Sequence, residues 1–380
     1  MTDQAMSDQA MSDRAVDRGM TAAAGERGRF RLGRLNVEVR REAGAAWRAF
    51  LTAASVALGL GLSAAILVAA GVPAANLVDE LLVQTLFDGQ NLHAVLFQAA
   101  PLMLLGLAAA MAFRVRFWNL GLEGQMIFGG IGATAVSLAG VGPESLRLPM
   151  MGLAAIVFGM AWTSVPLLLK LKVGVNEIIS TLLLNYVAMN LLFHLLYGAW
   201  KDPRDGFPHS PAFAPFETLP TIAFDLSAAL VVALAAVAFC VYLLARSRAA
   251  IYMRFVEASP SAARALGVPV AGVTIFAVLL SGALASLAGF VIVSGQEGRL
   301  TQSFFHGYGV SGVLIAFLAR SNPLAAAIVA TLMATLYVAG QNLQVFYAIP
   351  GAMVQLIQAL VVICVAASDF LVRHRVRWVR

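Results

Sequence analysis

Residues 226–245 read LSAALVVALAAVAFCVYLLA, a run of twenty residues without one charged side chain. An α-helix of this length is about 30 Å long, which matches the hydrocarbon thickness of a bilayer. The whole chain has the same character, because 60% of its 380 residues are hydrophobic, 12% are charged and the mean hydropathy is +0.82. These values exclude an ordinary soluble domain and predict helices that lie in lipid.

Ten such runs lie along the chain, so we expect an all-α polytopic membrane protein of about ten transmembrane helices. Two of them, at 125–140 and 308–319, are too short for a full span, which is typical of broken or re-entrant helices surrounded by protein. The other runs lie at about 50–71, 93–113, 148–169, 177–197, 226–245, 273–294, 323–342 and 350–371.

The basic residues predict the orientation, because short cytoplasmic loops of membrane proteins retain Lys and Arg. With the N-terminus inside, 22 of the 26 basic residues lie on the cytoplasmic side and four lie outside. We therefore expect a cytoplasmic basic tail at 1–48, disordered in its first part, a transmembrane domain at 49–372 and a second cytoplasmic basic tail at 373–380. This polarity explains the net charge of +6 without nucleic-acid binding.

Two connections are long enough to do more than turn. The outside loop at 198–225 is rich in proline and aromatic residues and suits a lid or a docking surface. The inside loop at 246–272 contains a short capped helix, in which Ser259 can be the N-cap, Pro260 the first helical residue and Gly267 the residue after the end. This helix is either a compact knob on the cytoplasmic surface or an interfacial helix on lipid headgroups. The residues expected on one face of it are Ala262, Ala263 and Leu266.

The densest polar cluster within reach of the membrane is FWNLGLEGQ at residues 117–125. Gly121 and Gly124 allow the backbone to leave the helix, so that freed amide and carbonyl groups can face a water-filled path or a solute. We expect the polar side chains of the cluster to line this path, although they could instead only cap the following helix. These side chains are Asn119, Glu123 and Gln125.

A second polar cluster begins the fifth apolar segment. Asn176 and Glu177 precede an apolar run that contains Asn185. Polar groups at such positions are costly unless they face protein or water, which makes all three candidates for the same path. Asn185 could equally form a hydrogen bond between helices.

Two patterns in the second half concern packing and symmetry. Ser281, Ala285 and Gly289 recur at four-residue spacing, which predicts close approach of a neighbouring helix. The glycine-rich residues 307–312, GYGVSG, begin the eighth segment much as the cluster at 117–125 begins the third. An offset of five segments reverses the orientation of the second copy, so we expect two inverted repeats with a pathway between them.

Signals for catalysis are weak. Residues 309–312, GVSG, match the Gly-x-Ser-Gly of intramembrane serine proteases, with His194 as a conceivable base, but Ser311 is expected at the membrane edge and His194 is more simply structural. The sequence contains no His-Glu-x-x-His motif, no metal-ligand spacing and no phosphate-binding P-loop. We therefore expect no catalytic residue, no metal site and no cofactor bound by this chain.

Three stretches together resemble the permease subunits of ABC importers for branched-chain amino acids, monosaccharides and nucleosides, nearest to the nucleoside and simple-sugar branch. They are residues 113–125, 176–186 and 257–267, and the resemblance extends over about 45–375. Where this family often has a small residue before Phe-Asn, this chain has RFWN at residues 116–119, with the bulky Trp118.

The resemblance implies a membrane subunit of an ATP-driven importer, located in the cell inner membrane, that moves a nucleoside or simple sugar by alternating access. It implies a cytoplasmic ABC ATPase that uses ATP and Mg, a second permease in a heterodimeric pair and an extracytoplasmic solute-binding protein. An ion-coupled secondary transporter is the alternative, but it would need an ion site in mid-membrane, whereas Glu123 and Glu177 lie near helix ends.

By the same resemblance, the short inside helix corresponds to the coupling helix that contacts the ATPase. The residues expected at that contact are Glu257, Ala258, Ser259, Ala262, Ala263, Leu266 and Gly267. The residues expected along the translocation pathway are Asn119, Gly121, Glu123, Gly124, Gln125, Asn176, Glu177 and Asn185.

Overall fold

The structure is a computed structural model in which the chain forms two compact units. The smaller unit comprises Met1–Ala70 and Gln355–Arg380, and the larger one comprises Gly71–Val354. The expected disorder of the first tail lies outside the described residues. These are 29–32, 35–39, 44–74, 83–204, 206–222, 226–305 and 307–378.

The smaller unit combines helices with a short sheet. Helix α2 (Ala45–Ala69) contacts α15 (Gly351–Arg373) closely, since a Cβ on Gly59 would lie 2.9 Å from the Cα of Val361. The sheet is antiparallel in the order β1-β2-β3, and β2 pairs Val37 with Val376 of β3. The expectation of an all-α protein did not include these strands. Their bounds are Arg29–Leu32 for β1, Leu35–Val39 for β2 and His374–Trp378 for β3.

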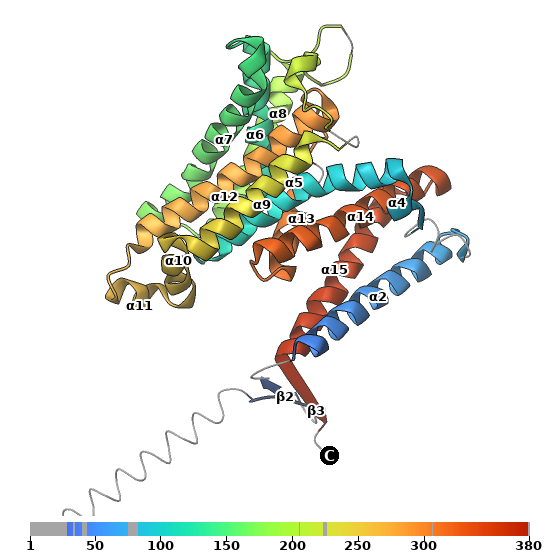
Figure 1. Cartoon of the computed structure of the whole chain (residues 1–380), viewed down its shortest axis with the longest axis vertical. Coiled ribbons are helices and arrows are strands. Elements are labelled where there is room, and N and C mark those ends of the chain that lie inside the picture. The colour runs from blue at the N-terminus through green and yellow to red at the C-terminus, as the bar shows by residue number, and fades with distance from the viewer. Residues whose placement is uncertain are drawn as a thin grey trace, which may run out of the picture. The chain divides into compact units, whose positions relative to one another are not determined.

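The larger unit is a bundle of helices (Figure 1). The apolar runs quoted from the sequence each coincide with one of its helices or with α2 or α15, which confirms the helical membrane character. In chain order, the elements are α4 (Gln84–Phe87), α5 (Gly89–Phe113), α6 (Leu122–Ala139), α7 (Glu144–Leu168), η2 (Leu169–Val173), α8 (Glu177–Tyr197), η3 (Pro215–Glu217), α9 (Ala228–Arg246), α10 (Arg248–Ala258), α11 (Pro260–Ala265), α12 (Val270–Ile292), η5 (Val293–Glu297), α13 (Tyr308–Leu318) and α14 (Pro323–Tyr347).

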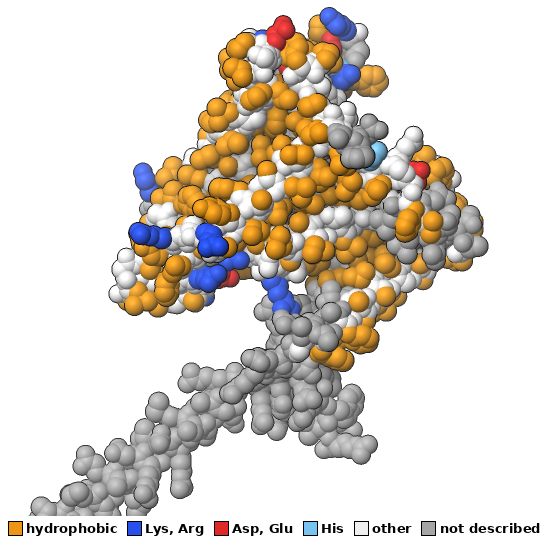
Figure 2. Space-filling model, in the orientation of Figure 1, with side chains coloured by type: hydrophobic (Ala, Val, Ile, Leu, Met, Phe, Trp, Pro, Cys, Tyr) orange, Lys and Arg blue, Asp and Glu red, His pale blue; other side chains and the backbone are white. Residues whose placement is uncertain are grey.

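In the described part of the chain, seven helices are long and apolar enough to cross a membrane. They are Gly89–Phe113, Glu144–Val173, Glu177–Tyr197, Ala228–Arg246, Val270–Glu297, Pro323–Tyr347 and Gly351–Ser368. Two shorter apolar helices, Ala53–Ala69 and Tyr308–Leu318, accompany them, and the second is the short segment expected at 308–319. Apolar side chains cover the middle of the larger unit, and Lys and Arg gather at the end that carries α10 and α11 (Figure 2). A lipid-facing belt with a charged rim is the surface expected of a membrane protein.

Helix α5 forms the core of the larger unit, because every residue from Gln98 to Ala112 is buried. It packs on α12, α13 and α14, while α12 packs on α5, α6 and α7. Each of these two helices is therefore covered on several sides, which explains why both are almost continuously apolar.

Glycines bring α6 and α12 into backbone contact. A Cβ added to Gly129 would lie 2.0 Å from the carbonyl oxygen of Ser286, and one added to Gly289 would lie 2.0 Å from that of Met126. Only residues without a Cβ permit this approach. The close packing predicted from Ser281, Ala285 and Gly289 is confirmed.

Candidate functional site

The connection between α5 and α6 is the break in the helix that the glycine cluster predicted. Residues 114–121 have no α-helical conformation, and α6 begins at Leu122. Gly121 is the N-cap residue of α6. The backbone therefore leaves the helix at the sequence position that was expected to open a path.

Asn119 and Gln125 form a buried amide pair across this break. The Nδ2 of Asn119 donates to Oε1 of Gln125 and to Oγ of Ser281, each at 3.0 Å. The Oδ1 of Asn119 accepts from Nε2 of Gln125 at 3.0 Å and from the Gly121 amide at 3.1 Å. All three side chains are fully buried, so in this conformation the pair holds the break against α12 and is not exposed to a cavity.

A cavity of about 410 Å³ lies beside the break, between α6, α8 and α13. Its walls are mostly apolar and include two aromatic rings, and Glu123 is the one carboxylate among its described lining residues. The lining residues are Leu120, Glu123, Ile127, Leu182, Asn185, Tyr186, Met189, Phe305, Gly309, Val310 and Val313. Of the expected pathway residues, the structure thus places Glu123 and Asn185 at the cavity.

Asn185 satisfies the backbone groups that the break sets free. Its Oδ1 accepts from the Gly124 amide at 2.8 Å, and its Nδ2 donates to the Leu120 carbonyl at 2.9 Å. This is the hydrogen bond between helices that was left open as an alternative, and it occurs at the cavity wall. Glu123 is held in a similar way, because its Oε1 accepts from the Gly307 amide at 3.2 Å, just before α13 begins.

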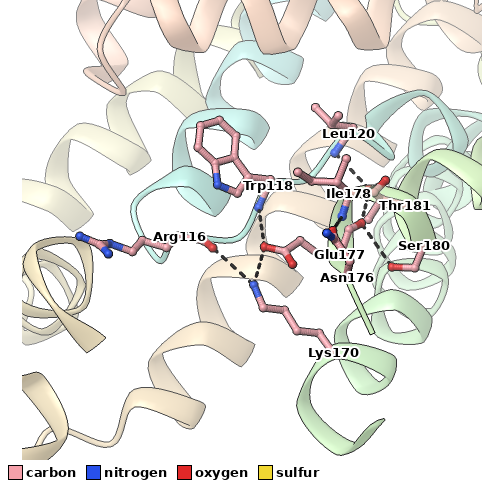
Figure 3. A network of polar contacts seen from close by, with 9 residues as sticks. All are labelled: Arg116, Trp118, Leu120, Lys170, Asn176, Glu177, Ile178, Ser180 and Thr181. Atoms are coloured by element: carbon pink, nitrogen blue, oxygen red, sulfur yellow. Dashed lines mark hydrogen bonds and ion pairs between the residues drawn. The ribbon is translucent and has the colours of Figure 1, made fainter. Parts of the chain in front are cut away.

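Asn176 and Glu177 anchor the start of α8 beneath the break (Figure 3). Asn176 is the N-cap, and its Oδ1 accepts from the Ile178 amide at 2.8 Å. Glu177 forms an ion pair with Lys170 and accepts from the Trp118 amide at 3.5 Å. Glu177 therefore binds the α8 terminus to residues 114–121, whereas Asn176 caps α8, and neither of these predicted pathway residues lines the described cavity.

Two arginines that follow α5 contact other turns at the same end of the larger unit. Arg116 donates from Nε to the Glu257 carbonyl and from Nη2 to the Ala258 carbonyl, both at 2.8 Å. Arg114 donates from Nη2 to the Ser321 carbonyl at 2.8 Å and lies 4.0 Å from the Glu257 carboxylate. Burial lowers the pKa of the Arg114 guanidinium from its usual value, while the Glu257 charge acts in the opposite direction.

The short capped helix predicted in the inside loop is confirmed as α11. The Oγ of Ser259 accepts from the Ala262 amide at 3.3 Å, and Gly267 follows the helix with a φ of +78°. Leu266 is 68% exposed. The expectation that Ala262, Ala263 and Leu266 share one face was wrong, because Ala263 is buried whereas Ala262 and Leu266 are exposed.

On the opposite end of the larger unit, the loop after α8 is attached to the segment before α13. The Phe213 amide donates to the Gly298 carbonyl and the Leu219 amide to the Ser294 carbonyl, both at 2.7 Å. Glu217 is buried in this loop and accepts from Ser137 Oγ at 2.7 Å. Its carboxylate also pairs with Arg147 at 3.3 Å, which ties the loop to the α6–α7 turn.

The sequence of this chain matches a known protein family. Residues 91–366 match the model of the family described as the permease component of the branched-chain amino acid transport system. The chain belongs to this permease family. It is therefore a transport subunit of the cell membrane and not an enzyme by itself, which replaces the protease alternative. Membership of this family also replaces the alternative of an ion-coupled secondary transporter.

Individual relatives of the permease are ABC transporter permeases for sugars and nucleosides. A glucose ABC transporter permease of Haloferax volcanii is 34% identical over 90% of this chain and 94% of its own length. A guanosine ABC transporter permease of Bacillus subtilis is 28% identical over 83% and 92%, and a nucleoside ABC transporter permease of Lactococcus lactis is 24% identical over 83% and 89%.

Several residues that organise the permease were not predicted from the sequence. Arg114, Arg116 and Lys170 were used only to orient the helices, because a basic residue in a short loop gives no hint of its partner. The buried pair of Arg147 with Glu217 was missed as well, since the two residues lie far apart in the sequence. The sequence does not distinguish Glu217 from an exposed carboxylate, because its burial is visible only in the structure.

Proposed function

We propose that this permease forms half of the membrane channel of an ATP-driven importer and moves a nucleoside or a simple sugar by alternating access. The observation that carries the proposal is the cavity of about 410 Å³ beside the broken start of α6. Its size falls within the roughly 300–1,000 Å³ typical of small-ligand sites. Relatives named for glucose, guanosine and nucleosides support the solute class.

The chemistry of the cavity suits a neutral solute with hydroxyl groups and a flat ring. Tyr186 and Phe305 offer aromatic faces, and the Glu123 carboxylate can accept hydrogen bonds from hydroxyl groups. Gly121, Gly124 and the remaining expected pathway residues act behind this wall by shaping the break.

The partners of the permease belong to the same proposal. A cytoplasmic ABC ATPase that uses ATP and Mg would contact the exposed surface of α11, where Leu266 projects. An extracytoplasmic binding protein would deliver the solute to the loop that contains Glu217. A second permease would pair with this one along α8, whose outer face exposes Leu183 and Val187. The chain itself would bind no cofactor.

The proposed topology has ten membrane segments, two inverted repeats and both termini in the cytoplasm. The packing supports the repeats, because α5 contacts α12, α13 and α14 just as α12 contacts α5, α6 and α7. A two-fold relation that exchanges the first set of helices with the second reproduces these contacts. Alternating access then arises from movement of one repeat against the other around the cavity.

The coupling assignment is tested by co-purification with the ATPase. We expect the double change Glu257→Ala and Leu266→Ala to abolish co-purification, because it removes a charge and the exposed apolar anchor next to α11. Leu153→Ala, which truncates an exposed leucine on α7, is the matched control and should leave the complex intact. Unchanged co-purification of the double variant would refute the coupling assignment.

The transport mechanism is tested by uptake into proteoliposomes that contain the permease, its ATPase and its binding protein. Uptake of a labelled nucleoside or of glucose should require ATP on the side of the membrane that carries the ATPase. It should persist in the presence of an ionophore. Uptake that continues without the ATPase and collapses with the ionophore would contradict the proposal and favour an ion-coupled mechanism.

A further inference from the structure

Arg116 has a backbone conformation that is unusual for its residue type. Its φ is +55°, in the left-handed region that is disfavoured for residues with a Cβ. The residue is held there from both sides, because its side chain binds the end of α10 and its carbonyl accepts from Lys170 Nζ at 3.4 Å. Such over-determined conformations are typical of functional positions.

The side chain of Arg116 holds the junction from which α11 begins. Its two donors bind the carbonyls of Glu257 and Ala258, the last two residues of α10, and Ser259 then caps α11. Carbonyls at the C-terminal end of a helix lack helical partners and carry partial negative charge. A guanidinium with two parallel donors matches such a pair of acceptors better than an ammonium group does.

The main chain after Arg116 leads directly to the cavity. Four residues further on, the Leu120 amide donates to Thr181 Oγ1 at 3.3 Å and the Leu120 carbonyl accepts from Asn185. Leu120 itself lines the cavity. The segment between the two residues is also held by its own backbone, because the Asn119 amide donates to the Phe117 carbonyl at 3.0 Å and the Leu120 amide to the Trp118 carbonyl at 3.1 Å.

Figure 3 shows the polar contacts that hold the segment from Arg116 to Leu120. Arg116 points toward α10, whereas the Arg116 carbonyl, the Trp118 amide and Leu120 face the start of α8. Lys170 and Glu177 connect the carbonyl and the amide to each other, so the segment from Arg116 to Leu120 is attached to α8 at successive points. The segment and the start of α8 are therefore joined into one piece.

We propose that Arg116 is the positioning residue that transmits movement of α11 to the cavity. When the ATPase moves α11, the fork of Arg116 draws residues 116–120 and the start of α8 with it, and the cavity wall at Leu120 and Asn185 shifts. The inference rests on the proposed contact between α11 and the ATPase. It adds a specific mechanical link, which can fail even if that contact exists.

The test uses the complete transporter in proteoliposomes and measures solute uptake and ATP hydrolysis together. Arg116→Gly removes the side chain but suits the left-handed backbone, so the variant is expected to fold. We expect it to co-purify with the ATPase and to hydrolyse ATP, while solute moved per ATP hydrolysed falls roughly five-fold or more, the lower range of allosteric coupling. Arg116→Lys keeps the charge without the fork and should give an intermediate ratio.

Arg248→Ala is the control, because Arg248 is an exposed arginine at the start of α10, the helix whose last two carbonyls Arg116 binds. It should leave the ratio of uptake to ATP hydrolysis unchanged. A loss of fold stability alone would lower both rates in parallel and leave the ratio intact, so an unchanged ratio in Arg116→Gly refutes the proposal. Loss of co-purification in Arg116→Gly would also overturn it, by assigning Arg116 to assembly. Failure of the coupling assignment itself appears separately, in the Glu257 and Leu266 double variant.

Discussion

Gly129→Ala should destabilise the permease by forcing α6 and α12 apart. The added Cβ would lie 2.0 Å from the carbonyl oxygen of Ser286 and 2.6 Å from its carbonyl carbon and Cα, whereas ordinary contacts begin near 3.4 Å. A gap of about 1.4 Å must therefore open between two backbones, neither of which can rotate away. Overpacking of this kind costs about 3 kcal/mol, and the better helix propensity of alanine returns up to about 1 kcal/mol. The expected net loss is roughly 2 kcal/mol.

The loss can be followed through a native thiol. Cys240 on α9 is fully buried, so a thiol-reactive fluorophore labels it only on unfolding, once Cys364 has been replaced by alanine. A loss of roughly 2 kcal/mol corresponds to a fall in Tm of roughly 2.5 °C for a chain of 380 residues, because the unfolding entropy is about 2.1 cal/mol/K per residue. Gly152→Ala is the matched control. Gly152 lies on α7 and also faces α12, but its added Cβ would make an ordinary contact at 3.4 Å with the ring of Phe290. Equal Tm values for the two variants would show that the close approach of α6 and α12 is not rigid.

Two further predictions concern the ends of the larger unit. Glu217→Gln keeps the shape of the side chain but leaves the partly buried Arg147 without its counter-charge, so we expect a loss of about 2 kcal/mol in stability and faster proteolysis of the loop that contains residue 217. Glu144→Gln, at an exposed position, should change neither property. Ser259→Ala removes the N-cap bond of α11, worth about 1 kcal/mol, and should weaken ATPase binding roughly five-fold in a titration. Ser259→Asn retains a capping oxygen and should bind normally, and equal weakening by both changes would contradict the role of the cap.

The features that sequence predicted well are local. A run such as 226–245 defines a helix by its own composition, and α9 spans nearly the same residues. The cap, the first proline and the final glycine of α11 lie within nine residues of one another, so their combined signal needed no tertiary information. The helix break before α6 was likewise visible in its glycines.

The features that sequence did not predict depend on partners far along the chain. Asn119 was expected on an open path, yet it is buried because Ser281 and Gln125 satisfy its amide, and Ser281 is 162 positions away. Nothing local distinguishes Ala263 from Ala262 on a two-turn helix, although one faces the bundle and the other faces solvent. The bonds of Arg116 to the end of α10 join residues 141 and 142 positions apart, and no single-sequence pattern encodes such a distance.

The terminal sheet has a consequence for how this membrane protein is made. Strand β2 ends at Val39, and its partner β3 begins at His374, so the ribosome must add roughly 335 residues before the pair can form. At about 5–20 residues per second, this takes roughly 20 to 70 s. During that time the hairpin of β1 and β2 presents an unpaired strand edge while the helices insert, and such an edge can pair with other chains. Synthesis rate and chaperone supply should therefore influence the yield of the intact protein more than helix insertion alone would suggest.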